Sequence, residues 1–569
     1  VTYTFLLKGR GRIEEAGFLL LKGSYGMGEK KAQSFIKGAA VLTAAGLIAK
    51  VIGFIYRAIL PRLIGAEGYG LYQLAYPIYT TLLTVSRSGI PVALAKLIAA
   101  KMALEERRNA FKIFQVSRKL SIVVGLFFSI VMAILARPLI NILEWDTRAY
   151  YPVLAISPAI FFVSIMATYR GFFQGLQDMI PTALSQVAEQ FVKMLTMLIL
   201  VFLLLNRGLS IAVAGATFGV VTGAIVGLLI LLYIYYRQRK SIWESVNVGA
   251  IVNYNSWDIV KDIAYLGVPI TLAALVQPLM QLVDATIIPR RLAVAGFSVG
   301  TSTALYGYLG MAMTLVNFPS IITISLAVSL VPAISEAFAL KKDDLVRRRT
   351  ETGLRMGILI SLPAAMGLFV LAEPITGIIF AYSEAAIALE IVSWGVLFIA
   401  LQQISSAILQ GIGKTSIPAK NLLIGAICNG IINYILTAQP RFGIRGAALG
   451  TTIGFAVAAF LNLYHLKKYT DYKFDMKSYF IKPVLAVLIM AIIVRRGFPL
   501  MDSFLNILTG HSYSLATIIM IIFAAFIYLF LLLLLNLISY NDLAMLPFVG
   551  KRLADILTNL GLVRGNDGK

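Results

Sequence analysis

Apolar stretches of about 20 residues recur along almost the whole chain, separated by short segments that hold charged residues, Pro and Gly. A helix of that length crosses a hydrocarbon layer about 30 Å thick. The pattern predicts an all-α polytopic membrane protein with about fourteen membrane-spanning helices. They are expected near residues 38–60, 72–97, 119–142, 151–173, 184–205, 209–236, 262–288, 304–332, 352–372, 387–410, 419–438, 446–466, 481–499 and 514–537.

The sequence contains an internal repeat. QGLQDMIPTA, beginning at Gln174, returns as QGIGKTSIPAK, beginning at Gln410, each after a long apolar segment. Each copy would hold six helices, and an even number of spans gives both copies the same orientation. We therefore expect two six-helix lobes related by a parallel repeat, with a site between them near mid-membrane, and two additional C-terminal helices. Further pairs support this alignment: Pro61 with Pro289, Pro181 with Pro418, and Gly215 and Gly219 with Gly446 and Gly450.

The expected boundaries follow from this repeat. The first lobe should cover residues 27–240, the second 241–468, and the last two helices with a cytoplasmic tail 469–569. Residues 1–26 contain only short apolar runs broken by charges, so they are neither a signal peptide nor a span. We interpret them as a mis-assigned extension before a start at Met27, with a disordered cytoplasmic tail as the alternative.

Composition excludes an ordinary soluble protein, because 59% of the residues are hydrophobic and only 14% are charged. The net charge of +23 would suggest nucleic acid in a soluble protein. Here the basic residues gather in alternate short loops, which indicates membrane orientation and not a nucleic-acid partner. This bias predicts a multi-pass plasma-membrane protein with both termini in the cytoplasm. The single cysteine, Cys428, lies in an apolar segment and excludes a disulfide framework.

Three cations are candidates for binding an anion within the membrane. Lys50 and Arg57 share one face of the first predicted helix, and Arg87 interrupts the second just before Gly89 and Pro91. A charge at membrane depth usually faces a wet cavity or a partner, and the planar guanidinium of Arg suits phosphate. The alternatives are that Lys50 and Arg57 extend to the membrane surface, and that Arg87 binds loosened carbonyls at a bend.

Further polar residues are candidates for lining a cavity or for ion coupling. Glu189 and Lys193 are spaced i,i+4 on the fifth predicted helix, so they either neutralise each other or line a cavity. Gln277, Gln281 and Asp284 form a polar stripe on the seventh. Asp284 is expected either to bind a coupling Na⁺ or H⁺, or to pair with Arg57 or Arg87. Asn429 and Asn433 have the helical spacing typical of interhelical hydrogen bonds.

No catalytic pattern accompanies these residues in the sequence. His465 and His511 are far apart and belong to no metal-spaced cluster, and no Walker A phosphate loop is present. We therefore expect neither an enzyme nor a bound metal or cofactor. A transported species would be driven by Na⁺, by H⁺ or by the membrane potential.

Three segments resemble one group of membrane proteins. RLIGAEGYGLYQLAYPIY, SGIPVALAKLIA and QGLQDMIPTALSQ are similar to the stage V sporulation protein B group. This group is a branch of the multidrug/oligosaccharidyl-lipid/polysaccharide exporter superfamily, which includes MurJ lipid II flippases, Wzx polysaccharide flippases and MATE drug antiporters. The resemblance implies a V-shaped, MATE/MurJ-like bundle that moves an undecaprenyl-pyrophosphate-linked cell-wall precursor from the inner to the outer leaflet by alternating access. It also implies roles in sporulation and in peptidoglycan or polysaccharide biosynthesis.

MurJ-like members have essential arginines on their first two helices, and Arg57 and Arg87 are the nearest matches here. A further arginine of the second lobe has no clear counterpart, because Arg290 and Arg291 lie at the end of a span. The implied partners are a polyprenyl-linked glycan, the bilayer and cell-wall synthesis proteins, with the chain itself a monomer. In the Pro61/Pro289 register, Lys50 and Arg57 align with Pro278 and Ala285, so we expect the first lobe to bind substrate.

Two other functions fit the sequence. A MATE-type cation-coupled drug antiporter would depend on Asp284 or Glu189. A non-transporting scaffold for envelope or spore-cortex assembly would tolerate the loss of every buried charge.

Overall fold

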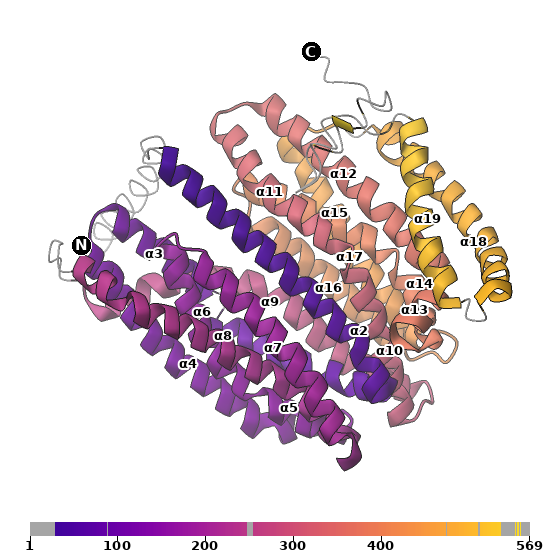
Figure 1. The fold of residues 1–569 in the computed structure, drawn as a ribbon, viewed down its shortest axis with the longest axis horizontal. Helices are drawn as coiled ribbons and strands as arrows, with labels where there is room; N and C mark the ends of the chain where they lie inside the picture. Colours follow the sequence, from indigo (N-terminus) through magenta and orange to yellow (C-terminus); the bar gives the residue numbers. More distant parts are fainter. Residues whose placement is uncertain are drawn as a thin grey trace. The chain divides into compact units, whose positions relative to one another are not determined.

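The structure is a computed structural model that describes residues 29–87, 89–246, 254–473, 475–509 and 513–535, together with the single positions 537, 552, 555, 556 and 558. Residues 1–26, for which we expect a mis-assigned extension or a tail, lie outside the described residues, as does His511. The described chain is helical almost throughout (Figure 1). This confirms the predicted all-α class.

The helices follow one another with short connections. The α-helices are α2 (Glu29–Arg87), α3 (Gly89–Ala103), α4 (Arg107–Ile142), α5 (Tyr150–Ile156), α6 (Pro158–Gly175), α7 (Ile180–Leu204), α8 (Leu209–Val246), α9 (Ser256–Val294), α10 (Val299–Asn317), α11 (Ser320–Ala339), α12 (Asp343–Val370), α13 (Ala372–Phe380), α14 (Ala386–Val392), α15 (Gly395–Gly411), α16 (Ser416–Leu436), α17 (Ile444–Thr470), α18 (Lys482–Thr509) and α19 (Tyr513–Leu534). A short π-helix, Lys477–Ile481, precedes α18.

Twelve helical segments of the described chain are long and apolar enough to cross a membrane, and the bent pair 383–392 and 395–411 makes a thirteenth. One of the twelve, Ala40–Ala103, has 64 residues. At about 1.5 Å per residue it can cross a 30 Å layer twice. Counted as two spans, it brings the total to the fourteen that the hydropathy pattern predicts.

Most of the predicted breaks between helices are present. The connection expected between residues 60 and 72 is confirmed, because α2 consists of two helices joined at a kink at Gly65, where φ is 74° and ψ is 174°. The helix predicted over 304–332 is wrong as a single element, since α10 ends at Asn317 and α11 begins at Ser320. Pro319 separates them because it lacks a backbone N–H and cannot continue the helical hydrogen bonds, although Phe318 and Pro319 both keep helical φ and ψ.

The interruption predicted at Arg87 is confirmed, because α2 ends there and α3 begins at Gly89. Gly89 lies against the backbone carbonyl of Gly267 on α9, where a side chain has no room. Its N–H donates to the Thr271 hydroxyl at 3.0 Å. The break therefore lets two backbones approach closely.

The duplicated motif folds in the same way in both copies. After α6, the N–H groups of Leu176, Gln177 and Asp178 donate to the carbonyls of residues 172, 174 and 173. After α15, the N–H groups of residues 412, 413 and 414 donate to those of 408, 410 and 409. Gln177 and Gly413 occupy matching positions with positive φ, 63° and 78°. This is the usual end of a helix, in which a left-handed residue satisfies the last carbonyls.

The chain divides into two compact units. Unit 1 comprises residues 1–56 and 74–282, and unit 2 comprises 57–73 and 283–569. The expected lobes, 27–240 and 241–468, are continuous stretches of the chain. In the structure, residues 57–73 of α2 belong to unit 2, and the first part of α9, up to residue 282, belongs to unit 1. In unit 2, Arg62 on segment 57–73 donates to the carbonyl of Ile379 at 2.9 Å, and the Tyr69 hydroxyl lies 3.0 Å from that of Thr314.

Glycine faces allow several pairs of helices to pack closely, and one such pair in each unit contains residues considered below. On α8, Gly219 and Gly223 lie against α7, where an added Cβ would come within 2.9 Å of the Lys193 carbonyl oxygen and 2.6 Å of the Glu189 carbonyl oxygen. On α17, Gly450 lies against the side chain of Asn433 on α16. Glycine allows such close approach because it has no side chain. The two pairs, α7–α8 and α16–α17, contain several of the residues considered below, whose partners lie on other helices.

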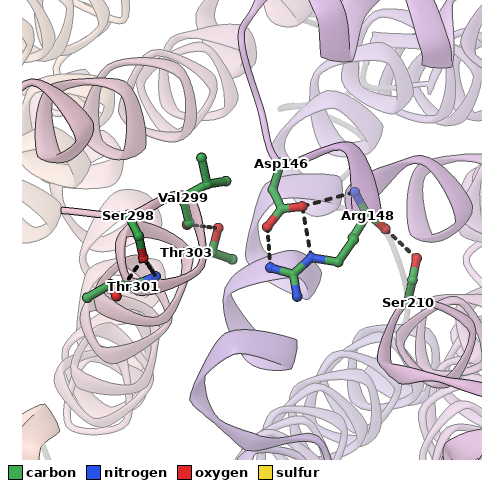
Figure 2. A network of polar contacts seen from close by, with 7 residues as sticks. All are labelled: Asp146, Arg148, Ser210, Ser298, Val299, Thr301 and Thr303. Carbon is green, nitrogen blue, oxygen red and sulfur yellow. Dashed lines mark hydrogen bonds and ion pairs between the residues drawn. The ribbon is translucent and has the colours of Figure 1, made fainter.

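Short polar networks fix the connections in each unit (Figure 2). In unit 1, Asp146 follows α4 and accepts a bond from the Arg148 backbone N–H at 3.0 Å and from its guanidinium at 2.6 Å. Ser210 donates to the carbonyl of Arg148. In unit 2, the Ser298 hydroxyl caps α10 by accepting from the Thr301 N–H at 3.2 Å. Such caps satisfy the backbone groups left free at helix ends.

Candidate functional site

In unit 1, Lys193 on α7 is a buried cation, with only 4% of its surface exposed. Its ammonium donates to the Tyr76 hydroxyl at 3.0 Å. It also lies 4.9 Å from the centre of the Tyr56 ring and 5.3 Å from that of Tyr76. A cation near an aromatic face is stabilised by the ring quadrupole, and this compensates part of its lost hydration. The aromatic rings therefore make burial of this charge possible.

Glu189, one turn before Lys193, forms an ion pair with Arg170 of α6, with 2.8 Å between Nη2 and Oε2. Arg170 also donates to the Ser185 hydroxyl at 3.0 Å. The i,i+4 pair predicted between Glu189 and Lys193 is therefore not the one that forms. Residue spacing places both on one face of α7, but α6 supplies a guanidinium with better geometry for the carboxylate.

Arg87 and Lys50 belong to unit 1 as well. Arg87 is half-buried and, with Lys193 and Glu189, interacts electrostatically with the buried Tyr79. Lys50 is exposed. Within the described residues neither Lys50 nor Arg87 forms a hydrogen bond or an ion pair, so both are free to bind an anion.

In unit 2, Asp284 on α9 is half-buried and is held by two amides of α16. The side-chain amide groups of Asn429 and Asn433 both donate to its Oδ1, at 2.6 and 2.8 Å. Asn433 also donates to Asn429 at 3.0 Å. Among the described residues of unit 2, no Lys or Arg pairs with Asp284, so the predicted alternative of a bond to Arg57 does not form there. Arg87 belongs to unit 1, and a bond between it and Asp284 stays a prediction. The interhelical hydrogen bonds predicted for the two asparagines are confirmed.

Asn433 has one unsatisfied atom. Its Oδ1 is buried and, among the described residues, has no hydrogen-bond partner, and it lies against Gly450 of α17. The neutral amides leave the negative charge of Asp284 uncompensated, because they supply dipoles but no positive charge. Hard cations prefer oxygen ligands such as the carboxylate of Asp284, although the two asparagines turn their amide nitrogens, and not their oxygens, toward it.

The remaining predicted residues are less enclosed. Gln277 and Gln281 are exposed on the part of α9 that belongs to unit 1, whereas Asp284 belongs to unit 2. Arg57 is half-buried and also belongs to unit 2. Arg291 stacks on the Tyr434 ring at 4.1 Å and donates to the Tyr434 carbonyl at 2.8 Å, so its contacts lie on α16.

Reasoning from sequence did not predict three participants. Tyr56 and Tyr76 were not singled out, because Tyr is common in apolar segments and no spacing links them to Lys193. Arg170 was not singled out either, because it stands near the end of its apolar segment. The charge of Arg170 at the end of an apolar helix is the sequence feature that could have indicated an acidic partner. Among the described residues, no group of three or more His, Cys, Asp or Glu is placed to hold a metal ion.

These features define a class of protein: a multi-pass membrane protein with duplicated helical motifs and charged side chains enclosed within its helix bundles. Residues 35–338 match the polysaccharide biosynthesis protein family, and residues 269–435 match the MatE family. The chain belongs to the polysaccharide biosynthesis protein family and, through it, to the multidrug/oligosaccharidyl-lipid/polysaccharide exporter superfamily. The predicted family membership is confirmed.

Two relatives from Bacillus subtilis illustrate the similarity. Stage V sporulation protein B is 31% identical over 91% of this chain and 99% of its own length. Lipid II flippase MurJ is 27% identical over 78% of this chain and 84% of its own length. The present chain is a transporter of the same superfamily as these relatives.

Solved structures share the fold. The inward closed conformation of lipid II flippase MurJ superimposes with a TM-score of 0.66 at 16% identity, covering 87% of this chain and 99% of that one. An inward-facing multidrug resistance MATE family transporter gives 0.63 at 18% identity, covering 75% and 94%. At these identities the likeness defines the fold alone.

Proposed function

We propose that this protein is a flippase that moves an undecaprenyl-pyrophosphate-linked, lipid II-like cell-wall precursor from the inner to the outer leaflet by alternating access. Similarity to stage V sporulation protein B along nearly the whole chain supports this proposal, as does similarity to lipid II flippase MurJ. The proposal includes a role in sporulation and cell-wall synthesis, both termini in the cytoplasm, a monomeric chain and no enzymatic activity.

The observation that carries this proposal is the presence of cations without partners inside an apolar span. Within the described residues, Lys50 and Arg87 make neither hydrogen bonds nor ion pairs, although both lie in the span Ala40–Ala103. A cation at membrane depth is costly unless it has a function. We assign pyrophosphate binding to Lys50, Arg57 and Arg87, because a diphosphate needs several positive charges and the guanidinium fork binds two oxygens at once.

The polyprenyl tail is assigned to the last two helices. α18 and α19 pack beside each other, with the Phe498 and Tyr513 rings 5.6 Å apart (Figure 1). Their outer faces are strongly apolar, and Ile507 and Phe526 are 85% and 66% exposed. A long hydrocarbon chain gains stability on such a surface without a closed cavity.

The pyrophosphate assignment is tested by Arg57→Ala and Arg87→Ala in a strain that lacks other flippases, with exposure of lipid II at the outer face as the measurement. Each variant should reduce exposure by about tenfold or more, since removing a charged contact costs at least about 1.5 kcal/mol. Arg137→Ala, at an exposed arginine of α4, is the matched control and should leave exposure unchanged. Wild-type exposure in both arginine variants at normal expression would contradict the anion site.

We further propose that Asp284, with Asn429 and Asn433, binds the coupling cation, either Na⁺ or H⁺. The support is an acid whose described partners are all neutral. Bound Na⁺ would raise the midpoint of thermal unfolding of the wild type as its concentration increases. Asp284→Asn should abolish this shift, whereas Asp258→Asn, at an exposed acid of α9, should keep it. A shift that survives in Asp284→Asn would contradict Na⁺ binding here.

A second function, a cation-coupled drug antiporter, is favoured by the MatE match over residues 269–435, which include Asp284 and both asparagines. Such a protein would protect cells against cationic dyes and would lose that protection in Asp284→Asn. Flippase activity without dye protection would exclude this candidate, and dye protection without lipid exposure would replace the first.

A further inference from the structure

Unit 2 contains a groove that none of the assigned functions uses. The groove has a volume of about 740 Å³ and lies between α12, α15, α17 and the connection that leads to α18. Its walls are apolar and include Leu354 and Ile358 of α12, Leu397 and Phe398 of α15, and Phe460 of α17. The Phe398 and Phe460 rings are 5.9 Å apart along one wall. This volume falls in the range of small-ligand sites, about 300–1,000 Å³.

One end of the groove is charged. Lys467, near the end of α17, and Lys473, in the connection, line it together with Asp471. All three side chains are exposed, so they meet solvent at the end of α17. The groove therefore joins a long apolar wall to a mouth with a net charge of about +1 at neutral pH.

The backbone holds this mouth in place. Asp471 ends α17 in a left-handed conformation, and its N–H donates to the carbonyl of Lys467 at 3.1 Å. The N–H of Lys473 donates to Glu351 of α12 at 2.9 Å, and Glu351 is paired with Arg347 at 3.1 Å. The two lysines thus project from a connection that is fastened to both α12 and α17.

The geometry points to a binding site for an anionic phospholipid, phosphatidylglycerol in particular. Its single phosphodiester charge complements the net positive mouth, its acyl chain fits the apolar wall, and its glycerol hydroxyls can donate to Asp471. Basic pockets next to apolar helix surfaces are characteristic sites for anionic lipid headgroups. The site is independent of the proposed pyrophosphate site, since it shares no residue with Lys50, Arg57 or Arg87.

The test is lipid retention by the full chain. The protein is reconstituted into nanodiscs of phosphatidylethanolamine and phosphatidylglycerol, re-extracted in detergent, and its bound lipid measured by mass spectrometry. Wild type should retain phosphatidylglycerol preferentially. The double variant Lys467→Gln/Lys473→Gln should retain phosphatidylglycerol about thirtyfold less strongly, since each of the two basic residues near a lipid surface contributes about 1 kcal/mol.

A matched control and a steric variant complete the design. Lys468→Gln removes an exposed lysine that neighbours Lys467 but does not line the groove, and it should retain lipid as the wild type does. Leu463→Trp fills the groove and should lower retention without a change in charge.

Four results would overturn the proposal. The first is unchanged retention in the double variant, and the second is equal loss in Lys468→Gln. The third is displacement of phosphatidylglycerol by undecaprenyl phosphate, which would assign the groove to the transported lipid. The fourth is equal retention of phosphatidylethanolamine by the wild type. It would show that apolar contacts alone hold the lipid, and it would contradict a charge-selective site.

Discussion

The α7–α8 pair of unit 1 and the α16–α17 pair of unit 2 have the same glycine packing but opposite chemistry. In the first pair, buried ionic groups have charged or aromatic partners: Arg170 for Glu189, and Tyr56 and Tyr76 for Lys193. In the second, the asparagines of α16 hold Asp284, and its described partners carry no charge. The two helix pairs share their glycine packing, but the charged residues of the first pair have no counterparts in the second.

The difference suggests that the charges of the first pair stabilise the fold, whereas the charge of Asp284 serves to bind a ligand. A buried charge with a charged partner is costly to break, because removal of one partner leaves the other unpaired. An acid with only neutral partners already lacks compensation and is therefore suited to a mobile cation. Substitutions in the two pairs should consequently have very different effects on stability.

The largest effect is expected from Arg170→Ala. It leaves Glu189 unpaired, with only 15% of its side chain exposed, and should lower the free energy of unfolding by about 3–5 kcal/mol. The measurement is denaturant unfolding in mixed micelles, followed by tryptophan fluorescence. The double variant Arg170→Met/Glu189→Met should recover most of the loss, because it removes both charges. A double variant less stable than the single one would show that the ion pair is not the cause.

A smaller loss is expected from Gly450→Ala, which places a methyl group against Asn433. Overpacking of this kind costs about 1–3 kcal/mol. Gly367→Ala, on α12, is the control: nothing lies within 4 Å of its added Cβ, so no loss is expected. If the two variants unfold alike, the contact between Gly450 and Asn433 does not position the asparagines.

Tyr76→Phe should lower the free energy of unfolding by about 1.5 kcal/mol, the usual contribution of a hydrogen bond to a charged group. The ring remains, so its attraction for the Lys193 ammonium is retained. In a Lys193→Met background the same change should have almost no effect, since the ammonium is gone. A double-mutant cycle measures this coupling, and additive losses would argue against a direct interaction.

The smallest effect on stability is expected from Asp284→Asn in buffer without Na⁺. The substitution removes a charge that has no charged partner among the described residues, and we expect a change within about 1 kcal/mol. A loss as large as that of Arg170→Ala would mean that Asp284 is paired, and the contrast between the two helix pairs would disappear.

The sequence determined which segments are helical and apolar, because the length of an apolar run and the positions of Pro and Gly act locally. It also determined the duplicated turn at Gln174 and Gln410, whose helix-ending hydrogen bonds involve only neighbouring residues. The family likewise followed from short motifs. The triad Lys50, Arg57 and Arg87 remains a prediction, because its function depends on a ligand.

Only the tertiary structure decided which polar groups meet. The i,i+4 spacing placed Glu189 and Lys193 on one face, but α6 brought Arg170 to the acid, and α2 brought Tyr56 and Tyr76 to the lysine. The asparagine pair Asn429 and Asn433 was recognised separately from Asp284, because 145 positions separate Asp284 from Asn429 in the chain. Spacing along one helix determines which residues share a face. Packing between helices determines which side chain of another helix contacts that face. This packing depends on shape and on close approach at positions such as Gly450.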